Sequence, residues 1–174
     1  YWEANMELID IIPEFNLYEE FWKIYTKGDV IPPQYISSEA KIERSIISEG
    51  AEIYGEVHNC VIGADVTVEK GAVVRDSIIM KHAVIGAGCE INKAIIAEEV
   101  NVGENVVMGI GDEVPNVYKP AVYSFGLVTV GEGSVIPPGV KIGKNTAISG
   151  ATCPEDYPDG ELASGGVILK KDGE

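Results

Sequence analysis

The chain has 174 residues, of which 28 are acidic and 13 basic, giving a formal charge of −15, and 45% of its residues are hydrophobic. Such an acidic surface repels phosphate backbones and anionic lipids, which argues against a nucleic-acid-binding or membrane-binding protein. The hydrophobic share suffices for one packed domain, and no apolar run has the length of a membrane span or the form of a signal peptide.

The three cysteines, Cys60, Cys89 and Cys153, are an odd number without the spacing of a disulfide framework. This usage is typical of a reducing compartment, so we expect a cytoplasmic protein. The first residue is Tyr1 rather than methionine, from which we expect that a further segment of a longer protein preceded it.

The first 35 residues are predicted to form a helical linker. Apolar residues at helical spacing predict a helix over residues 1–12 that Pro13 should end. Asn16 with Glu19 resembles a capping box and predicts a second short helix near residues 17–21. A stretch rich in glycine and proline then leads into the next segment. The residues behind these predictions are Tyr1, Ala4, Leu8 and Ile11 for the first helix, and Lys27-Gly28-Asp29 and Pro32-Pro33 for the linker.

From residue 36 onward the chain is an internal repeat. Branched aliphatic anchors recur with a period of 17 residues: Ile62, Val68 and Val74, then Ile79, Ile85 and Ile91, then Ile96, Val102 and Met108. The first eight are followed four positions later by Val66, Ala72, Ile78, Ala83, Cys89, Ile95, Val100 and Val106. Upstream anchors are Ile36, Ile42, Ile47, Ile53 and Val57, and downstream ones are Val130, Ile136, Ile142 and Ile148, with Ser134, Val140, Thr146 and Thr152 as their companions.

A hexad with one branched residue and a small companion describes a short strand followed by a corner. Three hexads then make a triangular coil, and stacked coils pair their strands about 4.8 Å apart. Equivalent residues pile into columns, such as Cys60 with Ser77 and Ala94, or Gly71 with Gly88 at a corner. A helix would require an apolar spacing of three to four, which this stretch lacks.

Two segments interrupt or end the repeat. Residues 109–125 break the hexads and are predicted to be a loop insertion, rich in apolar residues, that packs against its own solenoid or a second subunit. We therefore expect at least a dimer. Residues 153–161 and 166–169 are predicted to fold back over the last coil, where they would cover exposed strand edges.

The hexads resemble those of the hexapeptide-repeat family, in units such as Ile62-Gly63, Ile85-Gly86, Val102-Gly103 and Ile142-Gly143. Parallel crossovers are normally right-handed, but the resemblance implies the opposite hand. The predicted fold is therefore all-β: a single-stranded left-handed parallel β-helix over residues 36–174, preceded by the helical linker of residues 1–35.

The opening block Tyr1-Trp2-Glu3-Ala4-Asn5-Met6, followed by Pro-Pro and hexads, resembles the domain boundary within bacterial glucose-1-phosphate adenylyltransferases. That resemblance implies a preceding nucleotidyltransferase domain which joins ATP and glucose 1-phosphate into ADP-glucose and pyrophosphate for glycogen biosynthesis. Further matching blocks are Ile24-Tyr25-Thr26, Ser45-Ile46-Ile47, Ser77-Ile78-Ile79-Met80 and Val128-Thr129-Val130-Gly131-Glu132.

The resemblance also assigns roles. ATP and a divalent metal such as Mg²⁺ would serve the parent enzyme, whereas residues 1–174 would carry no catalytic, cofactor-binding or metal-binding residue and would be inactive alone. The β-helix would contribute oligomerisation, as a homodimer or homotetramer, and allosteric regulation. Its partners would be its own missing catalytic domain and a sugar-phosphate effector. In plant-type relatives a lysine helps to bind a phosphorylated activator, but Glu98 stands at that position here, which argues against an anion site there.

An alternative function is that of an acyl-CoA-dependent acyltransferase, since such solenoids often use a histidine as general base. His58 and His82 are both predicted at corners facing solvent, without a partnering carboxylate, and at non-equivalent positions that disfavour a shared metal. We interpret both as ordinary surface histidines.

Other reactive or basic groups have similarly plain interpretations. Cys60 and Cys89 are predicted to be buried packing thiols, whereas Cys153 is predicted to be exposed without an activating neighbour. Lys41 with Arg44, or Lys141 with Lys144, could grip a sugar phosphate but are interpreted as solvated side chains. The run Gly131-Glu132-Gly133 has an acidic centre and no following helix, unlike a phosphate-binding loop.

Overall fold

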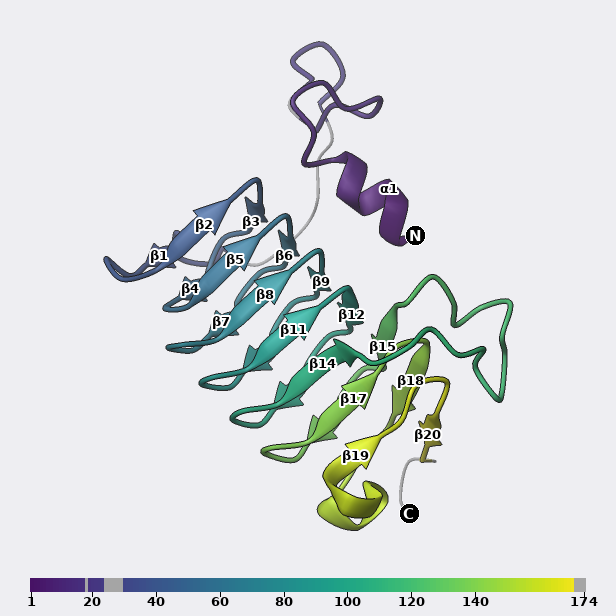
Figure 1. Cartoon of the computed structure of the whole chain (residues 1–174). Coiled ribbons are helices and arrows are strands. Elements are labelled where there is room, and N and C mark those ends of the chain that lie inside the picture. The colour runs from purple at the N-terminus through teal and green to yellow at the C-terminus, as the bar shows by residue number, and fades with distance from the viewer. Residues whose placement is uncertain (18, 24–29, 171–174) are drawn as a thin grey trace.

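The computed structural model describes residues 1–17, 19–23 and 30–170. The chain winds as a left-handed, triangular solenoid in which successive coils add one short parallel strand to each of three sheets (Figure 1). This arrangement confirms the predicted all-β, left-handed parallel β-helix.

The three sheets are named A, B and C in the order in which the chain visits them. Sheet A contains β1 (Tyr35–Ile36), β4 (Glu52–Ile53), β7 (Thr67–Val68), β10 (Val84–Ile85), β13 (Asn101–Val102) and β16 (Val135–Ile136). Sheet B contains β2 (Lys41–Glu43), β5 (Glu56–His58), β8 (Val73–Arg75), β11 (Glu90–Asn92), β14 (Val107–Ile110), β17 (Lys141–Gly143) and β19 (Glu161–Leu162). Sheet C contains β3 (Ile46–Ile47), β6 (Val61–Ile62), β9 (Ile78–Ile79), β12 (Ala94–Ile96), β15 (Val128–Val130), β18 (Thr146–Ser149) and β20 (Val167–Leu169).

The core is a set of inward columns built from the predicted anchors. In sheet C, for example, Ile62 pairs with Ile79, which pairs in turn with Ile96. All predicted anchors from Ile53 to Ile148 are buried. The earlier anchors, in β1 to β3, remain partly or largely exposed because they belong to the first coil, which has a neighbouring coil on one side only.

One feature of the companion pattern was predicted wrongly. As companions four residues after their anchors, Ile78 and Ile95 were expected to face inward. They lie beside the inward Ile79 and Ile96 on the same strands and therefore point to the outer side of sheet C, where Ile78 is nevertheless only 2% exposed. The inward companions are Ser77 and Ala94, three residues after their anchors, because a 17-residue coil has two sides of six residues and one of five. Ser77 is satisfied in the core, since its Oγ donates to the Arg75 carbonyl at 2.6 Å and accepts from the Ala94 N–H at 3.0 Å.

The corners also form columns, each requiring a residue in the left-handed backbone region. Gly71 and Gly88 occupy one such column with φ near +70°, as predicted. The corner between sheets B and C instead uses Asn59, Asp76 and Lys93, with φ between +49° and +56°. Asn and Asp tolerate this conformation better than most residues, and Asn59 donates to the Asp76 carboxylate at 2.5 Å.

The N-terminal segment differs from its prediction. Helix α1 (Trp2–Glu7) ends before Leu8, well short of Pro13, and its last turn closes with bonds to carbonyls three residues back, such as Leu8 N–H to Asn5 O. The second predicted helix, near residues 17–21, is absent from the described residues on either side of position 18, which itself lies outside the description. The predicted Lys27-Gly28-Asp29 linker also lies outside the described residues.

Helix α1 is held against the corner between sheets B and C. The Trp2 indole donates to the Asp76 carbonyl at 2.7 Å, and the Lys93 ammonium lies 5.4 Å from the centre of the Trp2 ring. Farther along the same corner, Arg44 pairs with Asp10 at 2.8 Å. These contacts attach the N-terminal segment to one edge of the triangle, along which α1 lies in Figure 1.

The C-terminal segment partly follows its prediction. Two 3₁₀ turns, Pro154–Asp156 and Pro158–Gly160, lie between β18 and β19 at the C-terminal end of the solenoid and bury the Tyr157 ring, whose hydroxyl lies 2.9 Å from the Thr152 hydroxyl. Residues 166–169 do not fold back as predicted. They include β20, which pairs with β18 and thus continues the solenoid.

The insertion predicted at residues 109–125 lies between β14 and β15, so the segment outside the strands is residues 111–127, hereafter the insertion loop. The coil closes across its base: the Val128 N–H bonds to the Lys93 carbonyl at 3.1 Å, and Val107 pairs with Lys141 in the following coil. The loop leaves the corner between sheets B and C, on the same edge as α1 (Figure 1).

The inward columns should dominate stability. Replacing Ile79 with Asp buries an unpaired carboxylate between Ile62 and Ile96, and we expect a loss of several kcal/mol in the free energy of unfolding. The control is Lys81→Asp at an exposed position, which replaces a surface ion pair with Glu98 by two solvated carboxylates and should cost less than about 1 kcal/mol. Thermal and urea melts measure both; equal damage would show that the inward column is wrongly assigned.

Candidate functional site

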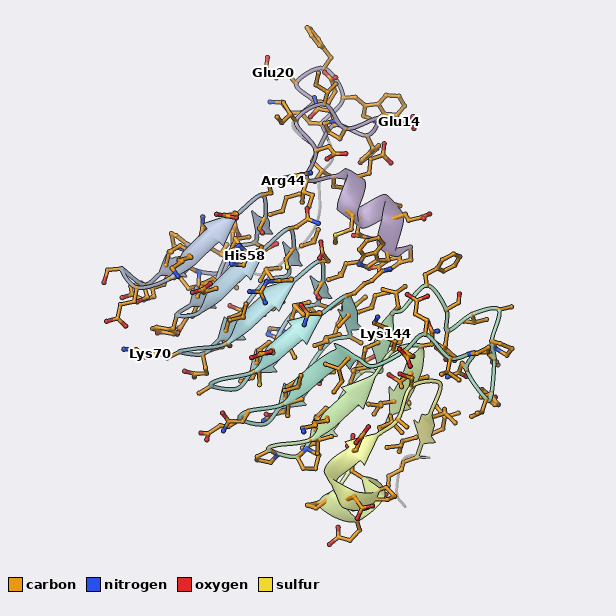
Figure 2. The ribbon with its side chains drawn as sticks, viewed as in Figure 1. Glu14, Glu20, Arg44, His58, Lys70 and Lys144 are labelled. Atoms are coloured by element: carbon orange, nitrogen blue, oxygen red, sulfur yellow. The ribbon has the colours of Figure 1, made fainter. Side chains whose placement is uncertain are left out.

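His58 is surrounded by charged side chains on the outer face of sheet B (Figure 2). Its Nδ1 lies 3.2 Å from a Glu43 oxygen and its Nε2 lies 3.3 Å from a Glu56 oxygen. Lys41 pairs with the other Glu56 oxygen at 2.6 Å, and this hydrogen bond, assisted by His58, lowers the pKa of the Glu56 carboxyl. The prediction of a solvent-facing corner histidine without a carboxylate was therefore wrong for His58.

His82 does lie at an exposed corner, as predicted, but it too has a carboxylate neighbour. Its Nδ1 is 3.6 Å from Asp65, which occupies the same corner one coil earlier. The two histidines lie on different parts of the triangle and are not brought together. Within residues 1–17, 19–23 and 30–170, no three His, Cys, Asp or Glu side chains cluster in a way that could hold a metal ion.

Cys60 and Cys89 are buried packing thiols, as predicted. Cys60 Sγ donates to the His58 carbonyl at 3.1 Å, and Cys89 Sγ donates to the Gly103 carbonyl at 3.0 Å. Burial raises the pKa of the Cys60 thiol to about 12 and also raises the pKa of Cys89. A thiol held protonated in this way is a poor nucleophile.

Cys153 has neighbours that the sequence did not reveal. It is half-buried, its Sγ lies 3.1 Å from Asp156 and 3.5 Å from the Lys170 ammonium, and its hydrogen bond to Asp156 raises the thiol pKa. Lys170 pairs with Asp156 at 2.6 Å and is the main reason that the Asp156 pKa falls from 3.8 to about 2. The cluster joins the residue that follows β20 to the first 3₁₀ turn and so holds the C-terminal end of the solenoid in place.

The two basic pairs considered as phosphate grips differ in their surroundings. Lys41 and Arg44 are engaged by Glu56 and Asp10. Lys141 and Lys144 have no carboxylate within ion-pair distance among the described residues, and Lys144 lies near the base of the insertion loop (Figure 2).

Two further sequence features take ordinary structural roles. Glu98, at the position of the activator-binding lysine of plant-type relatives, pairs with Lys81 at 3.4 Å on the surface. Residues 131–133 form the corner that follows β15, with Gly133 at φ +66°, and lead into β16 rather than a helix.

A groove of about 390 Å³ lies between α1, sheet C and the insertion loop. The sequence did not predict this groove, because its walls come from residues 1–3 and from residues about 90 to 130 positions later. The corner residue Lys93 is the cation in the groove wall; the residues that line the groove are Tyr1, Trp2, Glu3, Lys93, Ile95, Val122, Tyr123, Phe125, Leu127 and Thr129.

None of the described helices is long and apolar enough to cross a membrane.

The thiols should differ in accessibility. At pH 8 and with iodoacetamide, we expect Cys153 to be alkylated first, because Cys60 and Cys89 are fully buried and protonated. Mass spectrometry of the native chain should find one modified thiol, and of the urea-unfolded chain three. Rapid alkylation of Cys60 or Cys89 in the native chain would contradict the inward placement of these residues.

The C-terminal cluster should make stability pH-dependent. Because the Asp156 pKa is lowered on folding, its contribution is fully present above about pH 4 and is lost as the pH falls toward 2. Asp156→Asn should therefore show a smaller drop in Tm between pH 5 and pH 2 than the wild type. Asp159→Asn, at an exposed neighbouring turn, is the control and should behave like the wild type; identical curves for all three proteins would contradict the assignment.

Comparison with known proteins places the chain among hexapeptide-repeat proteins. Residues 32–130 match the family model described as GlmU-like, C-terminal hexapeptide. A glucose-1-phosphate adenylyltransferase of Lachnospira eligens is 66% identical over 170 residues, which are 98% of this chain and 40% of that protein. Enzymes of the same name from Acetivibrio thermocellus and Thermotoga maritima are 46% and 45% identical, over 98% and 99% of this chain. The chain spans about two-fifths of the length of these curated relatives.

Proposed function

Since this chain belongs to the GlmU-like C-terminal hexapeptide family, and since glucose-1-phosphate adenylyltransferases match nearly all of it, we propose that it is the assembly and regulatory domain of such an enzyme. The observation that carries the proposal is the 66% identity across 98% of the chain. The parent enzyme would be cytoplasmic and would form ADP-glucose and pyrophosphate from ATP and glucose 1-phosphate with a divalent metal such as Mg²⁺. Those steps would use residues in the remaining three-fifths of the protein.

The distribution of reactive groups supports a non-catalytic role. In the described part of the chain, His58 and His82 lie on separate faces, and the buried thiols Cys60 and Cys89 are held protonated. General acid–base chemistry needs groups that converge on one reacting atom. The groove beside α1 supplies instead a largely apolar surface, with Lys93 and Glu3 as the charged side chains among its described lining residues, and such a surface is suited to packing.

Regulation by a sugar phosphate would require cations that are free to bind an anion. Lys141 and Lys144 meet that requirement within the described residues, whereas Lys41 and Arg44 already contact carboxylates. Lys144 also lies beside the insertion loop, so an anion bound there could act on the loop. Assembly as a homodimer or homotetramer would then transmit such a change between subunits.

The proposal is tested by comparing this chain with a longer protein in which the preceding region of the relatives is joined to Tyr1. With ATP, glucose 1-phosphate and Mg²⁺, the longer protein should form ADP-glucose, and residues 1–174 alone should not. A pyrophosphate-release assay measures both. Turnover by the short chain above the blank, or none by a folded longer protein, would refute the proposal.

The acyltransferase alternative is tested in parallel. Incubation of the chain with acetyl-CoA and small amine or alcohol acceptors should release no coenzyme A, and His82→Ala should change nothing. Release that is abolished by His82→Ala would instead assign a general base to the exposed corner where Asp65 lies 3.6 Å from His82.

A further inference from the structure

The large hydrophobic side chains that stay exposed gather outside the coils. Of seventeen such side chains in the described residues, eight belong to the N-terminal segment before β1 and five belong to the insertion loop. The five in the loop are Val114, Val117, Tyr118, Val122 and Phe125. Large contiguous apolar surface on a soluble protein usually marks an interaction site, so the coil faces are poorer candidates for an interface than these two segments.

The insertion loop is fixed at both stems by one buried side chain. Asn145, at the corner one coil below the loop, accepts a hydrogen bond from the Gly126 N–H at 2.7 Å and donates to the Val114 carbonyl at 2.9 Å. Its side chain thus joins the outgoing and the returning strand of the loop. A buried amide is stabilising only when its polar atoms are satisfied, and Asn145 satisfies both.

A second buried asparagine fixes the loop to the coils below. Asn116 is 2% exposed, and its Nδ2 donates to the Asn145 carbonyl at 2.8 Å and to the Gly166 carbonyl at 3.2 Å. Its Oδ1 accepts from the N–H groups of Tyr118 and Lys119, both at 2.9 Å. The two asparagines together define the asparagine clamp, which orders the loop without covering its apolar side chains.

The clamp fixes the base of the loop and leaves the apolar tip, residues 117–125, facing solvent. Val117 and Phe125 are 77% and 72% exposed. Phe125 also has φ +61°, a left-handed conformation that is costly for a bulky residue. Ordering a surface in advance removes part of the entropy cost of binding, so a clamped apolar tip is better explained by a partner than by packing within the chain.

The position of the tip identifies that partner. Val122 and Phe125 line the same groove as Tyr1 and Trp2, so the beginning of the chain lies directly beside the loop tip. Trp2 cannot move away freely, because it is bonded to the Asp76 carbonyl and lies against Lys93. Any polypeptide joined to Tyr1 must therefore emerge next to the tip.

We propose that the clamped loop tip is a docking surface for the region that precedes Tyr1 in the longer protein, a proposal that rests on the proposed function. The relatives have about three-fifths of their length outside the matched part, enough for a further domain. A second copy of the chain fits less well. A symmetric contact at the tip would bring its own Asp112 and Glu113 toward those of the first copy.

Hydrogen exchange compares the loop in the longer protein and in residues 1–174 alone. Backbone amides of residues 117–125 should exchange about tenfold more slowly in the longer protein, because the docked region covers them. Val117→Asp combined with Val122→Asp should abolish that protection, whereas Val135→Asp, an exposed apolar residue on sheet A, should retain it. Asn116→Asp, which removes the amide donors of the clamp, should reduce the protection although the tip side chains are unchanged.

Each other outcome has a defined meaning. Equal exchange rates in the two proteins would overturn the proposal. Sedimentation of residues 1–174 that shows a dimer, converted to monomer by the double Asp variant, would overturn it in favour of a second copy. Circular dichroism melts of the variants in the short chain confirm that the coils still fold. An active longer protein with an unprotected loop would refute docking alone, and an inactive one with a protected loop would refute only the proposed function.

Discussion

The hydrogen bonds between successive coils are the interaction on which the rest of the structure depends. Each strand has only two to four residues, too few to be stable alone, and each gains its partners solely from the strand directly above or below, as in the pairing of Ile62 with Ile79. Because that pairing is in register, side chains at equivalent positions of successive coils stack on one another, and every anchor position in an inward column must therefore be apolar. The corners inherit the same constraint, so each needs a residue that accepts positive φ in coil after coil.

The fold was predictable because this constraint requires the same kind of residue at regular intervals of the sequence. The anchors from Ile53 to Ile148 all proved to be buried, and the corner glycines Gly71 and Gly88 stack as expected. The error at Ile78 and Ile95 has a simple cause. One side of each coil is one residue shorter than the other two, so the inward companion lies three residues after the anchor on that side and not four. The hand came from the family resemblance, since periodicity alone is the same for either hand.

The surroundings of the candidate residues were much less predictable. The carboxylates beside His58 are those of Glu56, on its own strand, and Glu43, on β2. Glu43 pairs with His58 across 15 residues instead of the regular 17, so the period of the repeat does not predict their contact. The neighbours of Cys153 are Asp156, in a turn, and Lys170, directly after β20, a strand that had been expected to fold back over the last coil. The length of the N-terminal helix was predicted wrongly for a different reason. Its hydrogen bond to the Asp76 carbonyl and its contact with Lys93 are made by Trp2, which is not part of the apolar stripe that predicted a longer helix.

The closure of the coil beneath the insertion loop has a consequence for how such proteins diversify. The Val128 N–H bonds to the Lys93 carbonyl, and β15 joins β12 and β18, in the way that they would if the chain had turned the corner directly. The loop is therefore a cassette held by Asn116 and Asn145 rather than a part of the stack. Evolution can lengthen, shorten or exchange it without disturbing the register of the coils, and the solenoid serves as a fixed mount on which new recognition surfaces can be tried.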